Sequence, residues 1–309
     1  MNALGVQVEQ ARLTPVMSRL HPCFSLGNLA GAASVILVAR LSGAAGSGVV
    51  TPALVTLRAV AAVCGIGIAG SIPPAAAVPV VRAPAGGLHL PAGVLPLGAM
   101  AFSFGLVEGT AVDWSSVHVS DVARVEPATG ALGLVAVSLF MVLIRLFGVR
   151  AVARFGRVNV VRVGALVAAA GYVVTILGQP LPVLLVGWAL VGLGVGLIAP
   201  QVYAVAGHTG GARMLAVVVT FGYGAFLIGP AIIGALVARI GIGHAMTLPL
   251  VLSLVLVALS RVLSRGESAG RSRHTEAARR GRSVSASWSW EDGERPASGA
   301  APMLSRIPR

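Results

Sequence analysis

The chain has 309 residues, of which 56% are hydrophobic and 11% are charged, and its mean hydropathy is +0.89. Soluble domains carry roughly 25% charged residues, so this composition excludes a water-soluble enzyme and indicates a membrane protein. The formal net charge is +13, from arginines without a single lysine. These arginines stand at the ends of apolar runs and in the C-terminal segment, where they would meet anionic lipid headgroups, and this position argues against a nucleic-acid partner.

The apolar residues form eight runs, each about 20 residues long, which is the length with which an α-helix crosses roughly 30 Å of hydrocarbon. The sequence therefore predicts an all-α, polytopic membrane helix bundle with about eight transmembrane helices. The predicted spans are 24–43, 49–70, 93–112, 131–148, 160–178, 181–205, 215–238 and 243–263.

The arginines in the flanks of these spans are distributed unevenly. An even number of spans places both termini on one side, and arginine-rich flanks face the cytoplasm. One set of flanks holds eleven arginines: Arg12, Arg19, Arg82, Arg145, Arg150, Arg154, Arg157, Arg162, Arg213, Arg261 and Arg265. The other set holds three, which are Arg40, Arg124 and Arg239. The bias predicts a multi-pass protein of the inner (plasma) membrane with both termini in the cytoplasm.

Composition changes divide the chain further. Residues 71–92 are rich in Pro, Ala and Gly, as in a linker between helical bundles. From about 265 onward the chain has too little apolar surface to offset its ordering entropy, which predicts a disordered basic tail, either solvated or resting on anionic lipid. The predicted parts are a cytoplasmic lead-in segment (1–23), two helices (24–70), a cytoplasmic linker (71–92), six helices (93–264) and a cytoplasmic tail (265–309).

Several motifs resemble one family. Gly105-Leu-Val-Glu-Gly109 followed by Asp113-Trp-Ser115 is similar to an E-G-x-x-x-D-W-S signature that closes the seventh helix in a bacterial branch of the major facilitator superfamily. Residues 24–32 resemble the fifth helix of that branch, and residues 222–234 resemble the eleventh. Residues 1–9 are similar to the segment that leaves the fourth helix.

The resemblance implies a fold and a function. Family members have twelve helices in two halves, with the substrate path between the halves, and on this alignment the chain supplies helices five to twelve. Either the start codon lies upstream or the chain is a truncated remnant. The implied function is secondary active transport of a small solute by alternating access, coupled to protons and without a cofactor. The alternative is a non-transporting remnant or a membrane interaction protein.

A basic segment after the fourth predicted span resembles the family's cytoplasmic loop motif, G-x-x-x-D-R-x-G-R-R. This resemblance implies a gate that closes the cytoplasmic side, with a tight glycine turn and arginine donors. Val149 occupies the position of the acidic residue. The alternative is a basic loop that only obeys the positive-inside rule. The candidate gating residues are Gly148, Arg150, Arg154, Gly156 and Arg157.

Three charged residues are candidates for substrate contact or ion coupling. Glu108 lies inside the third predicted span, about 6 Å from its outer end by helical rise, so it is either a coupling carboxylate or a group hydrogen-bonded near the outer rim with Asp113 and Trp114. Arg58 lies near the middle of the second span, where a cation is costly. We therefore expect Arg58 to face the bundle or an aqueous cavity. The alternative is that the predicted boundary of the second span is misplaced along the sequence.

Glycines inside the spans predict close helix packing. Gly192, Gly194 and Gly196 lie in one apolar run, so they do not fit the strand–turn–helix context of a nucleotide loop. The pairs Gly27 with Gly31 and Gly192 with Gly196 have the small-xxx-small spacing, and Gly229-Pro230 predicts a kink. The six His are dispersed, which predicts neither a metal site nor catalysis.

Overall fold

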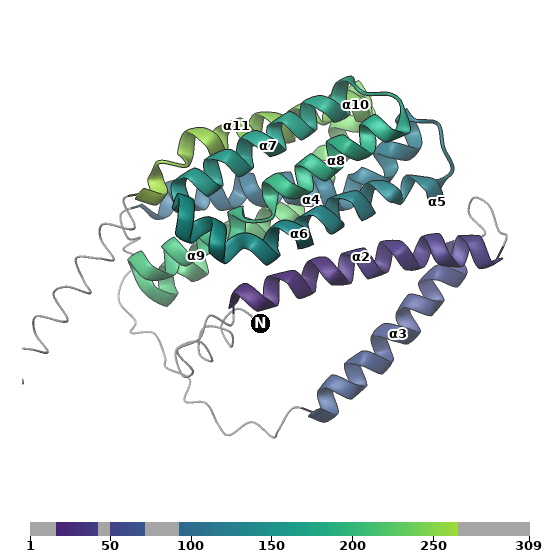
Figure 1. Ribbon diagram of the computed structural model, residues 1–309, viewed down its shortest axis with the longest axis horizontal. Helices are drawn as coiled ribbons and strands as arrows, with labels where there is room; N and C mark the ends of the chain where they lie inside the picture. The colour runs from purple at the N-terminus through teal and green to yellow at the C-terminus, as the bar shows by residue number, and fades with distance from the viewer. Residues whose placement is uncertain (1–16, 43–49, 72–92, 265–309) are drawn as a thin grey trace, which may run out of the picture. The chain divides into compact units, whose positions relative to one another are not determined.

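The computed structural model describes residues 17–42, 50–71 and 93–264, and within these ranges it contains helices and no strands. Figure 1 shows their arrangement. The helices are α2 (Met17–Ser42), α3 (Val50–Ser71), α4 (Val94–Val122), α5 (Pro127–Gly130), α6 (Leu132–Phe155), α7 (Arg157–Leu177), α8 (Leu181–Val195), α9 (Ile198–Ile240), α10 (Ile242–Ala245) and α11 (Thr247–Leu259). The predicted linker and tail, and most of the lead-in segment, lie outside the described residues.

The described residues contain five helical stretches that are long and apolar enough to cross a membrane. They are Val94–Val122, Pro127–Phe155, Arg157–Leu177, Leu181–Ile240 and Ile242–Ser264. This confirms the predicted all-α membrane helix bundle, and the protein is a multi-pass membrane protein. The helices α2 and α3 stand where the first two spans were predicted, although α2 begins at Met17 rather than at residue 24.

The stretch Leu181–Ile240 is 60 residues long and is interrupted twice. The first break is the turn at residues 196–197, between α8 and α9. The second is at Gly211, where φ is 67° and ψ is −161° inside α9. Only glycine adopts such a conformation without strain. The break at Gly211 falls between the sixth and seventh predicted spans, whereas the break at 196–197 was not predicted.

The third predicted span was too short. We placed its end at residue 112, but α4 continues to Val122. The resemblance to the E-G-x-x-x-D-W-S signature implies a helix end here, because that signature closes the seventh helix in the family. In the structure Ser115 and His118 are fully buried inside the protein, so the helix continues with its polar side chains shielded by neighbouring helices.

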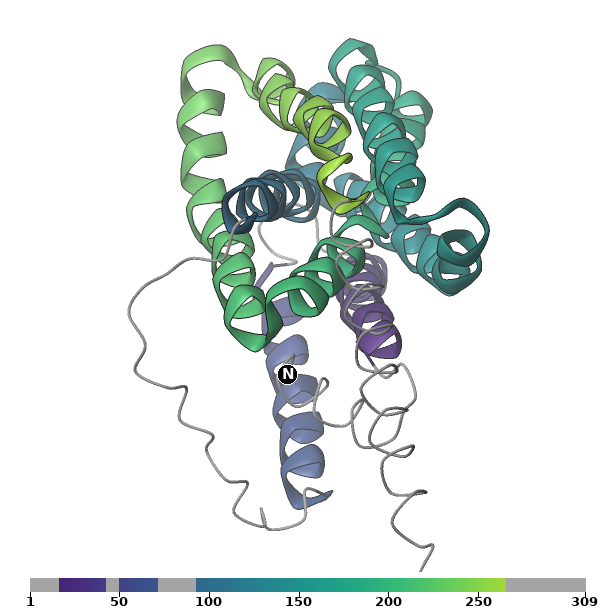
Figure 2. The same cartoon turned by 90° about the vertical axis from the view of Figure 1, so that its left-hand side faces the viewer.

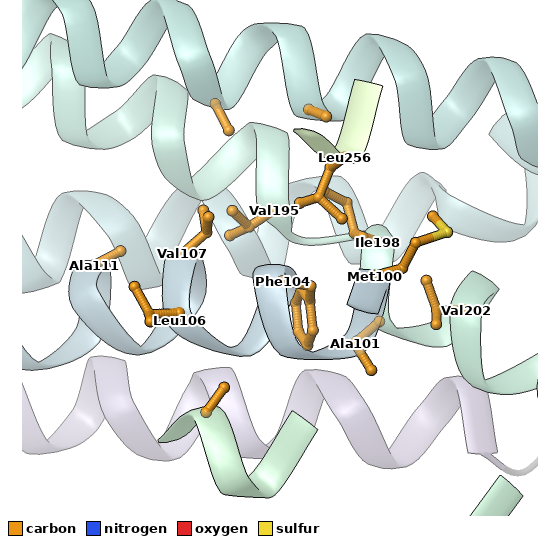
Figure 3. Close-up of a cluster of buried hydrophobic side chains, with 14 of the residues drawn as sticks. Met100, Ala101, Phe104, Leu106, Val107, Ala111, Val195, Ile198, Val202 and Leu256 are labelled. Carbon is orange, nitrogen blue, oxygen red and sulfur yellow. The ribbon is translucent and has the colours of Figure 1, made fainter. Parts of the chain in front are cut away.

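Helix α4 lies in the interior of the bundle. In an apolar segment of 18 residues within α4, 78% of the segment is buried inside the protein. In the corresponding segments of the other membrane-length stretches, the buried share is 33% to 56%. Helix α4 contacts α6, α8, α9 and α11, and Figure 2 shows it nearly end-on with α9 passing along one side. Buried side chains from these helices meet around it, as Figure 3 shows for Met100, Phe104, Val195, Ile198 and Leu256. Residues on α4 are therefore positioned by contacts on several sides.

Candidate functional site

Glu108 lies at the midpoint of α4, fourteen residues from Val94 and fourteen from Val122. Its exposed fraction is 3%. The predicted helix end at residue 112 is wrong, because α4 continues to Val122, whereas the depth of the Glu108 carboxylate in the membrane stays a prediction. By helical rise the carboxylate stands about 21 Å along the axis from either end of the helix, so it needs a partner inside the protein.

The partner is Arg145 on α6. The guanidinium Nη2 lies 3.3 Å from Oε1 of Glu108, and both side chains are 4% exposed. We had placed Arg145 in a cytoplasmic flank, but α6 continues ten residues beyond it to Phe155. A buried ion pair of this kind offsets the desolvation of its two charges only while both partners remain in place.

The same arginine also binds the break between α8 and α9. Its Nε donates a hydrogen bond of 2.9 Å to the carbonyl oxygen of Gly196. In a continuous helix that carbonyl would accept from the backbone four residues later, but residue 200 is proline and has no N–H. Arg145 thus satisfies a carbonyl that Pro200 leaves without its helical donor.

Two tyrosines stand close to this site. The hydroxyl of Tyr172 on α7 donates a hydrogen bond of 2.7 Å to the carbonyl of Val107, the residue before Glu108. Tyr172 also contacts Trp188 edge-to-face, with ring centroids 5.8 Å apart. The hydroxyl of Tyr203 on α9 lies beside Gly222, whose carbonyl faces Gly105 of α4. The charged pair therefore lies where α4, α6, α7 and the α8–α9 break converge, in a closed environment in which electrostatic interactions are strong.

Gly109, Asp113 and Trp114 of the E-G-x-x-x-D-W-S signature face away from the charged pair. Asp113 is exposed, and the structure does not bring it together with Glu108. A methyl group added at Gly109 would lie 3.2 Å from the ring of Phe226 on α9, and one added at Gly234 would lie 3.7 Å from Trp114. The signature thus combines one buried charge with small and large residues that fit α4 against α9.

The predicted gating loop is mostly helical. Gly148 is a buried residue of α6 and packs against Leu197, so it is not the glycine that forms the turn. The turn is at Gly156, with φ 76° and ψ 158°. Helix α6 continues past Gly148 to Phe155 and ends at Gly156, whose positive φ a helix does not accommodate.

The arginines of this segment lie around the turn. Arg150 and Arg154 are exposed, and Arg157, the first residue of α7, is half-buried. The guanidinium carbon of Arg154 lies 5.7 Å from the centre of the Phe155 ring. Basic side chains at this end of α6 and α7 agree with either the gating or the positive-inside interpretation.

The glycines of α8 support the predicted packing role. Those at 192 and 196 face α6, where they approach Val137 and Ile144. Gly194 faces α7 and approaches Gly164 and Ala168. Alternate glycines along one helix therefore allow close contact with two neighbours at once.

The remaining predicted positions show no such contacts. Among the described residues, no atom lies within 4 Å of a methyl group added at Gly27 or Gly31, so the structure does not show the helix contact predicted for that pair. Helix α9 continues through Gly229-Pro230, and its non-helical residue is Gly211. Arg58 is exposed on α3, and a contact with the bundle or with substrate stays a prediction.

Sequence reasoning missed Arg145 and Pro200 as site residues. Two signals in the sequence could have identified them. Arg145 lies within the apolar run that forms α6, and Pro200 follows Gly196 by four residues, which is the spacing of a helical hydrogen bond. Within the described ranges, no three His, Cys, Asp or Glu side chains gather in a way that could hold a metal ion. The chemistry available to the site is that of a carboxylate, a guanidinium and the backbone carbonyl at a helix break.

The sequence matches the Major Facilitator Superfamily over residues 85–292. It is 32% identical over 243 residues to an uncharacterized transporter of Sinorhizobium fredii, covering 76% of this chain and 62% of that protein. It is 29% identical over 268 residues to an uncharacterized MFS-type transporter of Yersinia pestis, covering 86% of this chain and 68% of that protein.

A third relative is the membrane protein MosC of Rhizobium meliloti, which is 27% identical over 178 residues, or 57% of this chain and 44% of that protein. No solved structure matches. The chain thus spans between about two fifths and two thirds of the length of these relatives. The family match covers more than half of the chain, and together with the multi-pass helical fold it shows that the chain belongs to the Major Facilitator Superfamily.

Proposed function

We propose that this chain serves secondary active transport of a small solute across the inner membrane, by alternating access and with coupling to protons, and that it is not an enzyme. Two relatives bear the name of transporters, and the family match covers most of the helical bundle. The observation that carries the proposal is the buried Glu108–Arg145 pair, whose arginine also holds the carbonyl of Gly196.

The pair supplies a two-state element. While Glu108 is charged, its attraction to Arg145 fastens α4 to α6 at mid-helix. When Glu108 takes up a proton, Arg145 becomes a buried cation without a counterion, which is strongly unfavourable. An arrangement that exposes Arg145 to water or to an anionic group of the solute is then favoured. Alternating access requires such a shift between two conformations of similar free energy.

The gating role stays part of the proposal. The exposed arginines 150 and 154, with Arg157 and the Gly156 turn, would stabilise the cytoplasmic side in one of the two conformations. Restoring the acidic residue by Val149→Asp should then slow transport, because the arginines gain a carboxylate partner in the closed state. Unchanged transport kinetics would favour the plain positive-inside interpretation.

Asp113 and Arg58 are candidates for a different role. Both side chains are exposed among the described residues, so neither serves the buried pair. We propose that they face the solute path or the other half of the transporter. Asp113→Asn and Arg58→Gln should each weaken solute affinity more than they change the maximum rate; unchanged affinity in both variants would remove this role.

Everted inner-membrane vesicles test the coupling. Respiration acidifies the vesicle interior, a pH-sensitive dye reports the gradient, and a panel of solutes is added to vesicles that contain the chain. A transported solute should dissipate the gradient in the wild type. Glu108→Gln keeps the shape of the side chain but cannot ionise, so it should abolish solute-dependent proton flux while solute exchange persists.

The matched control is Glu126→Gln, because Glu126 is an exposed acid beyond the end of α4. This variant should behave like the wild type. Solute-dependent proton flux in Glu108→Gln would contradict coupling at this site. Failure of every tested variant and of the wild type to move any solute would contradict transport itself.

A further inference from the structure

Four polar side chains between α4, α6 and α8 are buried without a hydrogen-bond partner among the described residues. Their polar atoms are the hydroxyls of Ser115 and Ser138, both imidazole nitrogens of His118, and the indole nitrogen of Trp188. The exposed fraction of each residue is 0% or 1%. Burying such groups without a hydrogen-bond partner is unfavourable, so their joint occurrence calls for a binding partner.

The two serines lie on the helix faces that carry the ion pair. Glu108 meets Arg145, whereas Gly133, twelve residues earlier on α6, meets the backbone of Ser115. Helices α4 and α6 are therefore antiparallel. Ser115 comes seven residues after Glu108, and Ser138 comes seven residues before Arg145. Seven residues are nearly two full turns, so both hydroxyls lie on the pair's side of their helices, about 10 Å along the axis.

The imidazole of His118 and the indole of Trp188 extend this row of unpartnered polar groups within the described residues, which we call the polar line. His118 is three residues beyond Ser115 on α4, and its ring contacts Trp188 of α8 edge-to-face, with centroids 5.4 Å apart. Asp121, three residues further along, is exposed. The polar groups thus extend from the exposed end of α4 toward the charged pair at its centre.

The chemistry of these groups selects their partner. An indole N–H only donates, a hydroxyl donates and accepts, and a neutral imidazole has one donor and one acceptor. Water matches this mixture, because each molecule offers two donors and two acceptors, and buried waters typically bind such otherwise unsatisfied groups. We propose that the interface of α4, α6 and α8 binds a chain of water molecules, held by Ser115, Ser138, His118 and Trp188, which leads toward Glu108.

The chain of waters has a function that rests on the proposed proton coupling. A proton taken up from bulk water near Asp121 passes along the hydrogen bonds, and each water accepts one proton and releases one. The last water releases its proton to a carboxylate oxygen of Glu108, which becomes a neutral carboxylic acid. In this step Arg145 keeps its charge, and the only covalent bonds that break and form are the O–H bonds through which the proton passes.

Hydroxyl-radical footprinting of the purified full chain tests the hydration independently of transport. A synchrotron X-ray pulse converts bound water to radicals that oxidise adjacent side chains. Modification rates are divided by the intrinsic reactivity of each residue type. Trp188 should be modified several-fold faster than Met100 and Met246, which are equally buried but do not belong to the polar line.

The variant Ser115→Ala/Ser138→Ala removes two water ligands and should lower Trp188 modification several-fold. Ser253→Ala is the matched control, because Ser253 is fully buried but its hydroxyl already donates to the carbonyl of Pro249; it should leave Trp188 unchanged. Thermal unfolding checks that both variants are folded. Trp188 protection equal to that of Met246, or modification that is insensitive to both serines, would overturn the proposed water chain.

The vesicle assay then tests the function. If the waters carry protons to Glu108, Ser115→Ala/Ser138→Ala should slow solute-dependent proton flux several-fold while solute exchange is kept. Normal proton flux in a variant with lost hydration would overturn proton delivery along this route. Absence of proton flux in the wild type would count against the proposed function, and footprinting would still decide whether water is bound.

Discussion

The two sides of α4 are held by different forces. Toward α6, the helix presents Glu108 to a buried arginine and carries Ser115 and His118 without protein partners. Toward α9, it presents glycines whose surfaces fit closely: a methyl group added at Gly105 would lie 2.6 Å from the carbonyl oxygen of Gly222. One contact depends on charge and hydration, whereas the other depends on shape.

The difference shows which contact can change during transport. The close packing of small residues between α4 and α9 does not depend on the protonation of Glu108, so these two helices should move together. The α4–α6 contact loses its main attraction when one charge is removed. We therefore expect conformational change to separate these two helices, and the following substitutions test each side.

The largest effect should come from Arg145→Gln. This change leaves Glu108 buried without a counterion and the Gly196 carbonyl with a weaker donor. We expect unfolding in mixed detergent micelles to become easier by about 3–5 kcal/mol. SDS titration, followed by circular dichroism, measures the difference.

The matched test removes both charges. Glu108→Gln/Arg145→Gln should be more stable than Arg145→Gln alone, because no unpaired buried charge remains. A double variant that is as unstable as the sum of both single variants would show that the two residues do not act as a pair.

On the α9 side, Gly105→Ala should destabilise by about 1–3 kcal/mol, as expected for overpacking. The added methyl group would meet the Gly222 backbone and the Ala225 side chain, and a backbone carbonyl cannot move aside easily. Gly224→Ala on α9 is the control, since no described atom lies within 4 Å of its added methyl group. Equal effects of the two substitutions would contradict close packing at this contact.

The two sides also differ in how far the sequence predicts them. Apolar runs and glycine spacing predicted the helices and the close contacts of Gly192 and Gly196, because span length and small side chains act locally. The Glu108–Arg145 pair was not predicted. It joins residues 37 positions apart, and the signature around Glu108 resembles one that closes a helix. The burial of the two charges depends on neighbouring helices, which local composition does not reveal.

A smaller effect should link Pro200 to Arg145. Pro200→Ala returns a backbone N–H that can donate to Gly196, so the hydrogen bond from Arg145 becomes partly redundant. In a double-mutant cycle with Arg145→Gln, we expect a coupling energy of about 1 kcal/mol, with Arg145→Gln less damaging in the Pro200→Ala background. Additive effects would mean that the arginine stabilises the site through Glu108 alone.

The smallest effect should come from Tyr172→Phe, which removes only the hydrogen bond to the Val107 carbonyl. Hydrogen bonds between membrane helices contribute about 0.6 kcal/mol on average, and the carbonyl keeps its helical donor. Stability should therefore fall by less than in Arg145→Gln or Gly105→Ala, and Tyr223→Phe, at an exposed position, should leave it unchanged. A loss comparable to that of Arg145→Gln would show that Tyr172 belongs to the charged network rather than to the surrounding packing, and that the polar side of α4 extends to α7.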